Sequence, residues 1–250
     1  ADAANVAEAA HWLCRIYLQN GQPEKARDLA VQVLPKATDD PYLVSLQMDR
    51  GDALYELDGS KQQAIDVYLT VVADHPNDKS APQALYNAAF AELESGQVDQ
   101  GLKHATAFLE AYPDHPLAPD VKYVAAECHL QRAEHGEAEK IYRALTGADI
   151  KHPDKETWQV RLGLAIYLQK RYEDAIAALA ELDPTNMAAG NAAESQFLTG
   201  ASQFYLQQYG PAVQAFRASL KADPEWKQAD ETLLFLARSL YRCGDQNGLG

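Results

Sequence analysis

Residues 197–224 read FLTGASQFYLQQYGPAVQAFRASLKADP, and this stretch decides the fold. Its first half carries apolar or small residues at the spacing of one helical face: Phe197, Gly200, Ala201 and Phe204. A short polar turn closing on Ala212 follows, and a second apolar pattern covers residues 213–220. Pro224 stands in the polar stretch after that pattern, where a helix ends. The stretch therefore predicts two helices joined by a tight turn.

The same pattern of helices, turn and proline recurs along the whole chain. A polar turn closes on an alanine at five positions: Ala26, Ala64, Ala138, Ala175 and Ala212. Aligned on these turns, repeats begin 37 or 38 residues apart at Ala7, Ser45, Pro82, Pro119, Glu156, Ala193 and Asp230. All 12 prolines fall in loops or near predicted helix ends. A proline inside a helix costs about 3 kcal/mol, so this placement supports paired helices.

Stacked helix pairs of this kind contact only their neighbours and form a solenoid. We therefore predict an all-α fold, a right-handed superhelical solenoid of helix–turn–helix repeats. A single domain over residues 1–250 is expected to hold six repeats and one terminal helix, thirteen helices in all. The predicted repeats are 7–44, 45–81, 82–118, 119–155, 156–192 and 193–229, followed by a terminal helix over 230–243.

The repeat resembles the tetratricopeptide repeat (TPR) family. Small residues occupy position eight, where the two helices of a pair approach closely: Cys14, Ala89, Ala126, Gly163 and Gly200. Besides the alanines at position twenty, the match includes aromatic residues at twenty-four and prolines at thirty-two: Tyr68, Tyr142, Phe216, Pro76, Pro113 and Pro224. The chain departs from the family in its period, because TPR repeats have about 34 residues. It also has Asp52 where a small residue is expected and Gly101 in place of an alanine.

One loop carries a second resemblance. Residues 108–119, FLEAYPDHPLAP, are similar to the loops of bacterial cell-envelope TPR proteins, such as outer-membrane-assembly lipoproteins and the Tol–Pal coordinating protein. This resemblance favours a periplasmic or cell-envelope location over a cytoplasmic one.

Composition excludes several classes of protein. The 22 Lys and Arg against 36 Asp and Glu give a net charge of −14. Binding to phosphates requires a basic face, so we expect no nucleic-acid partner. No apolar stretch approaches the roughly 18 residues of a membrane span, so no membrane insertion is expected. Cys14, Cys128 and Cys243 lack the spacing of a metal or redox motif and fit buried small hydrophobic residues.

The TPR resemblance implies that the first helix of each repeat lines a concave groove through positions two, five, six, nine, twelve and thirteen. These positions are rich in Tyr, Phe and Arg, which give large contact area and directional hydrogen bonds to a bound peptide. The candidate peptide-binding residues are Arg15, Asp49, Tyr86, Asn87, Phe90, Glu94, Tyr123, Glu127, Arg161, Tyr167, Phe197, Phe204, Phe235 and Arg238. The alternative is that some of these aromatic residues pack between repeats.

Charge is uneven along the solenoid. Residues 45–118 hold twelve acidic and four basic residues, a net charge of −8, whereas residues 193–229 hold three of each. An acidic groove near the N-terminus would favour a basic or amphipathic partner segment. The alternative is a solvated acidic face on the convex side.

Enzyme motifs are missing from the sequence. His75, His115 and His152 each precede a proline in the loops between repeats and lie near an aspartate, which permits a metal site. Turn chemistry explains these loops better, since Asp caps helices and Pro ends them. We therefore predict no catalytic residue, no metal site and no cofactor, and a non-enzymatic scaffold for protein–protein interaction.

The predicted terminal helix suggests a further alternative. It contains the apolar run TLLFLA at residues 232–237, whereas the end of a solenoid needs a polar outer face. Either the chain is part of a longer protein or this face is an interface of a homo-oligomer. Structural self-association is therefore the second functional hypothesis, and a metal-dependent enzyme is the third.

Overall fold

The computed structural model describes residues 5–37 and 40–246, and these residues form thirteen α-helices and one short 3-10 helix. No strand occurs within them, and the predicted all-α repeat solenoid is confirmed. None of the described helices combines the length and apolar character that a membrane span requires. The chain divides into two compact units, residues 1–131 and 132–250, which we describe separately. The predicted continuity of one domain through residues 1–250 stays a prediction.

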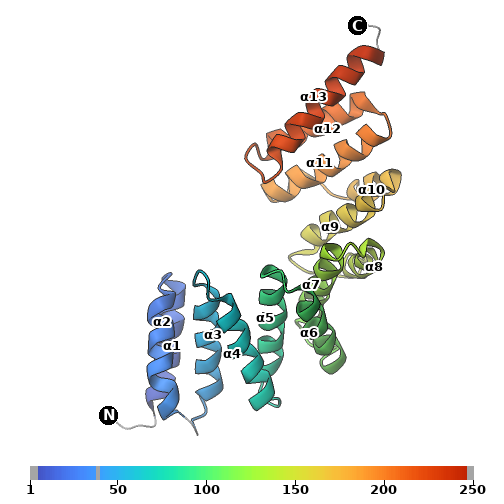
Figure 1. The fold of residues 1–250 in the computed structure, drawn as a ribbon. Coiled ribbons are helices and arrows are strands. Elements are labelled where there is room, and N and C mark those ends of the chain that lie inside the picture. Colours follow the sequence, from blue (N-terminus) through green and yellow to red (C-terminus); the bar gives the residue numbers. More distant parts are fainter. Residues whose placement is uncertain (1–4, 38–39, 247–250) are drawn as a thin grey trace. The chain divides into compact units, whose positions relative to one another are not determined.

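Unit 1 (residues 1–131) stacks its helices in the order of the sequence (Figure 1). They are α1 Val6–Gln19, α2 Pro23–Val33, α3 Leu43–Tyr55, α4 Lys61–Asp74, α5 Ala81–Glu94, α6 Val98–Ala111 and α7 Ala118–Gln131. The 3-10 helix η2, Leu34–Lys36, extends α2. Helix α1 also contacts α3, and α5 contacts α7, so first helices of successive repeats lie side by side.

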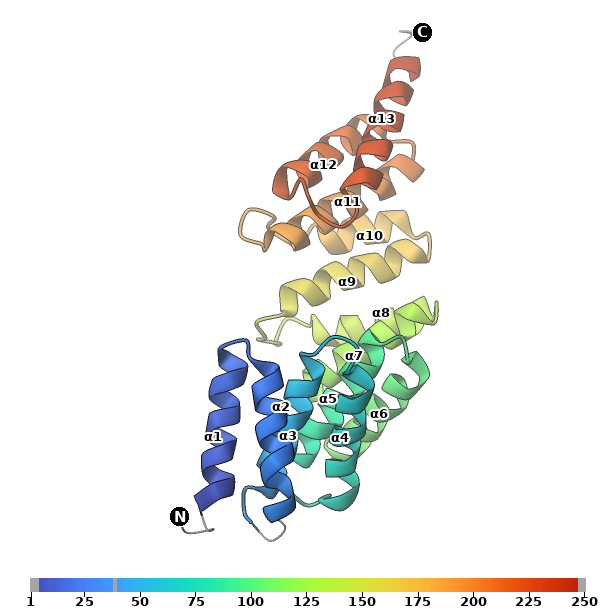
Figure 2. The same cartoon turned by 60° about the vertical axis from the view of Figure 1, so that its left-hand side comes forward.

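Within unit 2 (residues 132–250), the helices also pack in the order of the sequence (Figure 2). Its helices are α8 His135–Leu145, α9 Lys155–Leu168, α10 Tyr172–Leu179, α11 Ala189–Tyr205, α12 Tyr209–Ala222 and α13 Ala229–Gln246. Here α9 contacts α11, and α11 contacts α13. In both units, the first helix of each predicted repeat begins one to four residues before the predicted start.

Glycine at position eight lets the two helices of a pair touch. A Cβ atom on Gly200 of α11 would lie 2.9 Å from two ring carbons of Phe216 on α12. A Cβ on Gly163 of α9 would lie 2.4 Å from Leu179 of α10. Both distances are shorter than real carbon contacts, so a larger residue would force the pairs apart.

Repeat 2 has a different register from the one read from the sequence. In this repeat Gly51, one residue before Asp52, provides the close contact, because its Cβ would lie 2.5 Å from the ring of Tyr68 on α4. The turn between α3 and α4 spans residues 56–60, whereas the corresponding turn between α1 and α2 spans only residues 20–22. The longer turn shifts α3 by one residue relative to α4, and Asp52 therefore does not occupy the small-residue position.

Six turns between consecutive helices share one backbone conformation. Each places a residue at φ between 58° and 75°, and the six are Gly21, Gly59, Gly96, Ala133, Lys170 and Gln207. These positions repeat every 37 or 38 residues, in agreement with the predicted period. Glycine adopts this left-handed conformation without a steric cost. The three turns of unit 1 use glycine, and the three of unit 2 use residues that are strained there.

Candidate functional site

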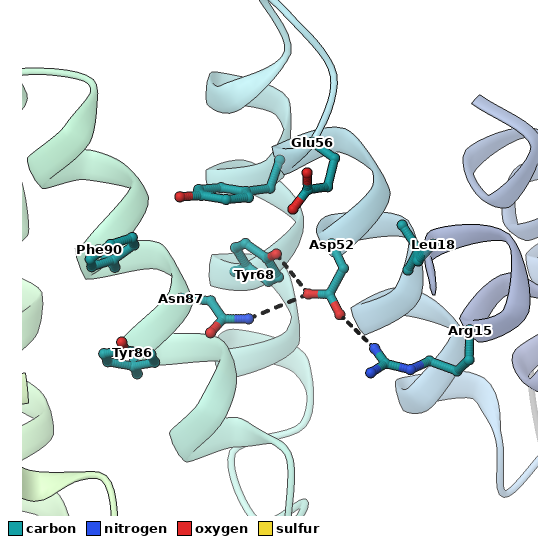
Figure 3. Close-up of a pocket in the computed structure, with 9 residues that line it drawn as sticks. Arg15, Leu18, Asp52, Glu56, Tyr68, Tyr86, Asn87 and Phe90 are labelled. Carbon is teal, nitrogen blue, oxygen red and sulfur yellow. Dashed lines mark hydrogen bonds and ion pairs between the residues drawn. The ribbon is translucent and has the colours of Figure 1, made fainter. Parts of the chain in front are cut away.

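The first helices of three successive repeats enclose a pocket in unit 1. Its volume is about 460 Å³. Side chains of α1, of α3 and its last turn, and of α5 form the walls, and Tyr68 reaches in from α4 (Figure 3). The lining residues are Arg15, Leu18, Asp52, Tyr55, Glu56, Tyr68, Tyr86, Asn87 and Phe90.

The carboxylate of Asp52 is the polar centre of this pocket. Arg15 Nη1 lies 3.0 Å from Asp52 Oδ2, and the Tyr68 hydroxyl donates to Oδ1 at 2.8 Å. The Asn87 amide donates to the same Oδ1 at 3.4 Å (Figure 3). Burial raises the pKa of Asp52, and the hydrogen bonds from Tyr68 and Arg15 oppose that shift. One acidic side chain thus connects α1, α4 and α5.

A second acidic residue, Asp49, lies close to Arg15. Asp49 is buried, with 1% of its surface exposed, and its Oδ2 lies 2.6 Å from Nδ1 of His11. Arg15 Nη1 lies 4.0 Å from the other carboxylate oxygen. Burial raises the pKa of Asp49 to about 6, although His11 and Arg15 both favour the charged form. Arg15 is therefore held between two aspartates.

The rim of the pocket combines acidic and aromatic side chains. The Tyr55 hydroxyl donates to the Glu94 carboxylate, which also accepts from Lys61 Nζ at 2.8 Å. Glu56 is exposed, and no ion pair to it exists among the described residues. On the α5 side, the rings of Tyr86 and Phe90 lie 6.1 Å apart. This arrangement suits a ligand with a cationic group next to an apolar one.

Of the predicted groove residues in unit 1, the pocket brings most together. Arg15, Tyr86, Asn87 and Phe90 line it directly. Asp49 and Glu94 adjoin it through their contacts with Arg15 and Tyr55. The two remaining residues, Tyr123 and Glu127 on α7, are half-buried and are not part of its lining.

The predicted groove residues of unit 2 separate into surface and core. Phe204 and Arg238 line a pocket of about 500 Å³ with Ala237, Tyr241 and Arg242. Arg161 pairs with Glu194 at 3.1 Å, and the ring of Tyr167 contacts those of Tyr172 and Tyr205.

The other two aromatic residues of the predicted set are buried. Phe197 and Phe235 are 5% and 7% exposed and pack together with Phe216 and Trp226. The alternative of packing between helices describes these two positions, because neighbouring helices cover them almost entirely. We leave both out of the candidate surface.

Five lining residues are absent from the predicted set: Leu18, Asp52, Tyr55, Glu56 and Tyr68. If repeat 2 is counted from residue 44, Asp52 and Tyr55 fall on groove positions nine and twelve. Gly51 was the available signal, since it is a small residue at position eight in that register. Leu18 occupies position twelve of repeat 1. Tyr68 reaches the pocket from a second helix, which the groove positions do not include.

The histidine loops perform turn chemistry. The backbone N–H of Leu117 donates to Nδ1 of His115 at 3.2 Å, and the N–H of Asp154 donates to Nδ1 of His152 at 3.2 Å. Both bonds span two residues and satisfy amides near helix starts. The turn interpretation assigned the capping to aspartate, whereas in these two bonds the histidine side chain is the acceptor.

Comparison with known proteins identifies the repeat. The sequence model of the family described as tetratricopeptide repeat matches residues 86–153 and 137–195. No curated protein sequence matches the chain at a significant level.

Solved structures show the same fold. PilF of Pseudomonas aeruginosa superposes with a TM-score of 0.67 at 14% identity, over 94% of this chain and 99% of that one. The apo form of RapI gives 0.68 at 12% identity, over 96% and 72%. A tetratricopeptide repeat protein from Parabacteroides merdae gives 0.52 at 15% identity, over 94% and 99%. Identities this low establish a shared fold alone.

Proposed function

We propose that this chain, whose residues 86–195 match the tetratricopeptide repeat model, is a non-enzymatic scaffold, because proteins with this repeat are generally protein–protein interaction modules. It binds a peptide or protein segment on the first helices of unit 1, in the pocket around Asp52. The observation that carries this proposal is the convergence of three successive first helices on one hollow. A single helix would present one row of side chains, whereas three helices together line a hollow.

The chemistry of the pocket favours a basic or amphipathic segment. Glu56 is an exposed acid without an ion pair among the described residues, and Asp52 lies in the same lining. Arg15 neutralises part of the charge on Asp52, so the negative potential is concentrated toward Glu56 and the rim. A Lys or Arg side chain of the partner would pair with Glu56 and lie against Tyr55 or Tyr86. A neighbouring apolar residue would contact Phe90.

A selection experiment tests this proposal. A displayed library of random dodecapeptides is passed over the immobilised full chain, and bound peptides are sequenced. We expect enrichment of Lys or Arg beside an apolar residue, and loss of binding in Tyr86→Ala and Glu56→Gln. Glu110→Gln is the matched control, because Glu110 is an exposed acid on α6 outside the pocket. Peptides that bind both pocket variants as well as the unchanged protein would contradict the proposal.

Self-association is the second candidate, and the exposed side chains of α13 favour it. Leu233, Leu234, Leu240 and Tyr241 are between 44% and 69% exposed, unusually open for large apolar residues on one helix. A Leu233→Glu, Leu240→Glu variant would then remain monomeric in light scattering at concentrations where the unchanged chain associates. A monomer at all concentrations for both proteins would remove this candidate.

A further inference from the structure

Three aromatic side chains in the lining of the pocket around Asp52 are partly exposed. They are Tyr55 on α3 and Tyr86 and Phe90 on α5. The rings of Tyr86 and Phe90 lie 6.1 Å apart, and their planes are tilted by 30°. The face of an aromatic ring is electron-rich and attracts cations. The pocket volume of about 460 Å³ lies within the range of small-molecule sites, roughly 300–1,000 Å³.

Two carboxylates next to these rings already accept hydrogen bonds from the protein. Three side chains donate to Asp52, and one of them is the hydroxyl of Tyr68. The Tyr55 hydroxyl and Lys61 Nζ both donate to Glu94. The hydroxyl protons of Tyr55 and Tyr68 are therefore committed to carboxylates, and most acceptor positions around the rings are in use.

The pocket nevertheless keeps a negative potential beside its rings. Glu56 is exposed, and no ion pair to it exists among the described residues. Burial raises the pKa of Tyr55, and so do its hydrogen bond to Glu94 and the charge of Glu56. Arg15, the cation of the lining, pairs with Asp52 and lies across it from α5 (Figure 3). The ring side of the pocket therefore favours a second cation, supplied by a ligand.

Hydrogen-bonding capacity distinguishes between cations. A Lys ammonium carries three N–H donors and an Arg guanidinium five, and each donor loses water when the pocket encloses it. With Asp52 and Glu94 already engaged, Glu56 would satisfy only part of these donors, and leaving the others unsatisfied is costly. A quaternary ammonium group has no N–H, and its methyl groups contact ring faces directly. We propose that the pocket around Asp52 binds a quaternary ammonium group, such as that of a trimethylated lysine.

This proposal deepens the proposed function, since it uses the same pocket and names the group that enters it. An unmodified Lys or Arg of the bound segment would pair with Glu56 at the rim. A trimethylated lysine would also lie among the rings of Tyr55, Tyr86 and Phe90. Methylation of one lysine would therefore strengthen binding without changing its charge.

Tetramethylammonium chloride is the first probe, and methylammonium chloride at equal ionic strength is the comparison. Each is titrated into the full chain while the ring C–H signals of Tyr55 and Tyr86 are followed by NMR. We expect saturable shifts with tetramethylammonium in the millimolar range and at least threefold weaker binding of methylammonium. Phe90→Leu and Glu56→Gln should each weaken tetramethylammonium binding at least threefold. Trp12→Leu is the control, because Trp12 is 56% exposed on α1 and does not line the pocket.

Two further probes identify the source of the quaternary group. Tighter binding of N-acetyl-trimethyllysine-amide than of choline would assign the group to a modified side chain, and the reverse order would assign it to a free small molecule. Equal affinities for tetramethylammonium and methylammonium would overturn the proposal. Equal binding of tetramethylammonium by Phe90→Leu, Glu56→Gln and the unchanged chain would overturn it too.

The outcome for this proposal is separate from the outcome for the proposed function. If tetramethylammonium does not bind while selected basic peptides still bind through Glu56 and Tyr86, the proposed function stands and the quaternary ammonium site is overturned. If tetramethylammonium binding depends on Phe90 and Glu56 but no peptide is selected, the quaternary ammonium site is supported and the proposed function is contradicted.

Discussion

Gly51 on α3 lies so close to Tyr68 on α4 that a Cβ atom on residue 51 would be 2.5 Å from Cε1 of the ring. The same ring is buried and donates its hydroxyl to Asp52. Close packing and the polar centre of the pocket are therefore coupled through one tyrosine. A substitution at residue 51 should therefore change the pocket around Asp52 as well as the packing of the core.

Gly51→Ala should destabilise the protein by about 1–3 kcal/mol, because the ring of Tyr68 must move to admit a methyl group. This cost exceeds the gain of about 1 kcal/mol that alanine brings to a helix interior. Urea unfolding followed by circular dichroism measures the change. Gly210→Ala on α12 is the control, since a Cβ there meets nothing within 4 Å. Equal effects of the two substitutions would show that the contact with Tyr68 is unimportant.

Lys170→Gly should stabilise the protein by about 0.5–1 kcal/mol. Lys170 has φ of 61°, a conformation that costs a residue with a side chain about 1–2 kcal/mol, and glycine removes that cost while adding entropy to the unfolded chain. Gly96→Ala, which introduces a side chain at the equivalent turn of unit 1, should destabilise by a similar amount. Unfolding of each variant in urea measures the change in its free energy of unfolding. A destabilised Lys170→Gly would mean that its side chain makes a contact worth more than the strain.

The helical pairs, their period and the close contacts at position eight follow from the sequence, because prolines, turns and small residues all recur at one spacing. The sequence predicted only some of the residues that line the pocket. A turn over residues 56–60 shifted the register of α3 by one residue, and that shift moved Asp52 and Tyr55 onto the groove side. Phe197 and Phe235 show a different limit of prediction from the sequence. A groove position and a packing position carry the same residue types, so only the neighbouring helices decide between them.

The contribution of Asp49 to the free energy of unfolding should decrease as the pH rises from about 4 to 6. Its pKa in the folded protein is raised to about 6, so the folded state binds this proton more tightly than the unfolded state does. The resulting stabilisation is complete below the pKa of the unfolded chain and is lost as the pH passes the folded value. A shift of about two pKa units corresponds to roughly 3 kcal/mol.

The measurement is the free energy of unfolding of the unchanged protein and of Asp49→Asn at pH 4, 5, 6 and 7. Asparagine does not titrate, so the difference between the two proteins reports the contribution of the Asp49 carboxyl group together with its contacts to His11 and Arg15. The unchanged protein should lose stability relative to the variant over this range, and Glu110→Gln should not alter the slope. Parallel curves for the unchanged protein and Asp49→Asn would show that Asp49 titrates normally.

The most direct test of the central claim is calorimetric titration of one selected basic peptide into four proteins: the unchanged chain, Glu56→Gln, Tyr86→Ala and Glu110→Gln. Loss of the exposed acid and loss of the aromatic wall should each weaken binding at least tenfold, and the effect of Glu56→Gln should shrink as salt is added. Glu110→Gln should bind like the unchanged chain. If the peptide binds all four proteins with the same affinity, the pocket formed by α1, α3 and α5 is not the site where this scaffold holds its partner.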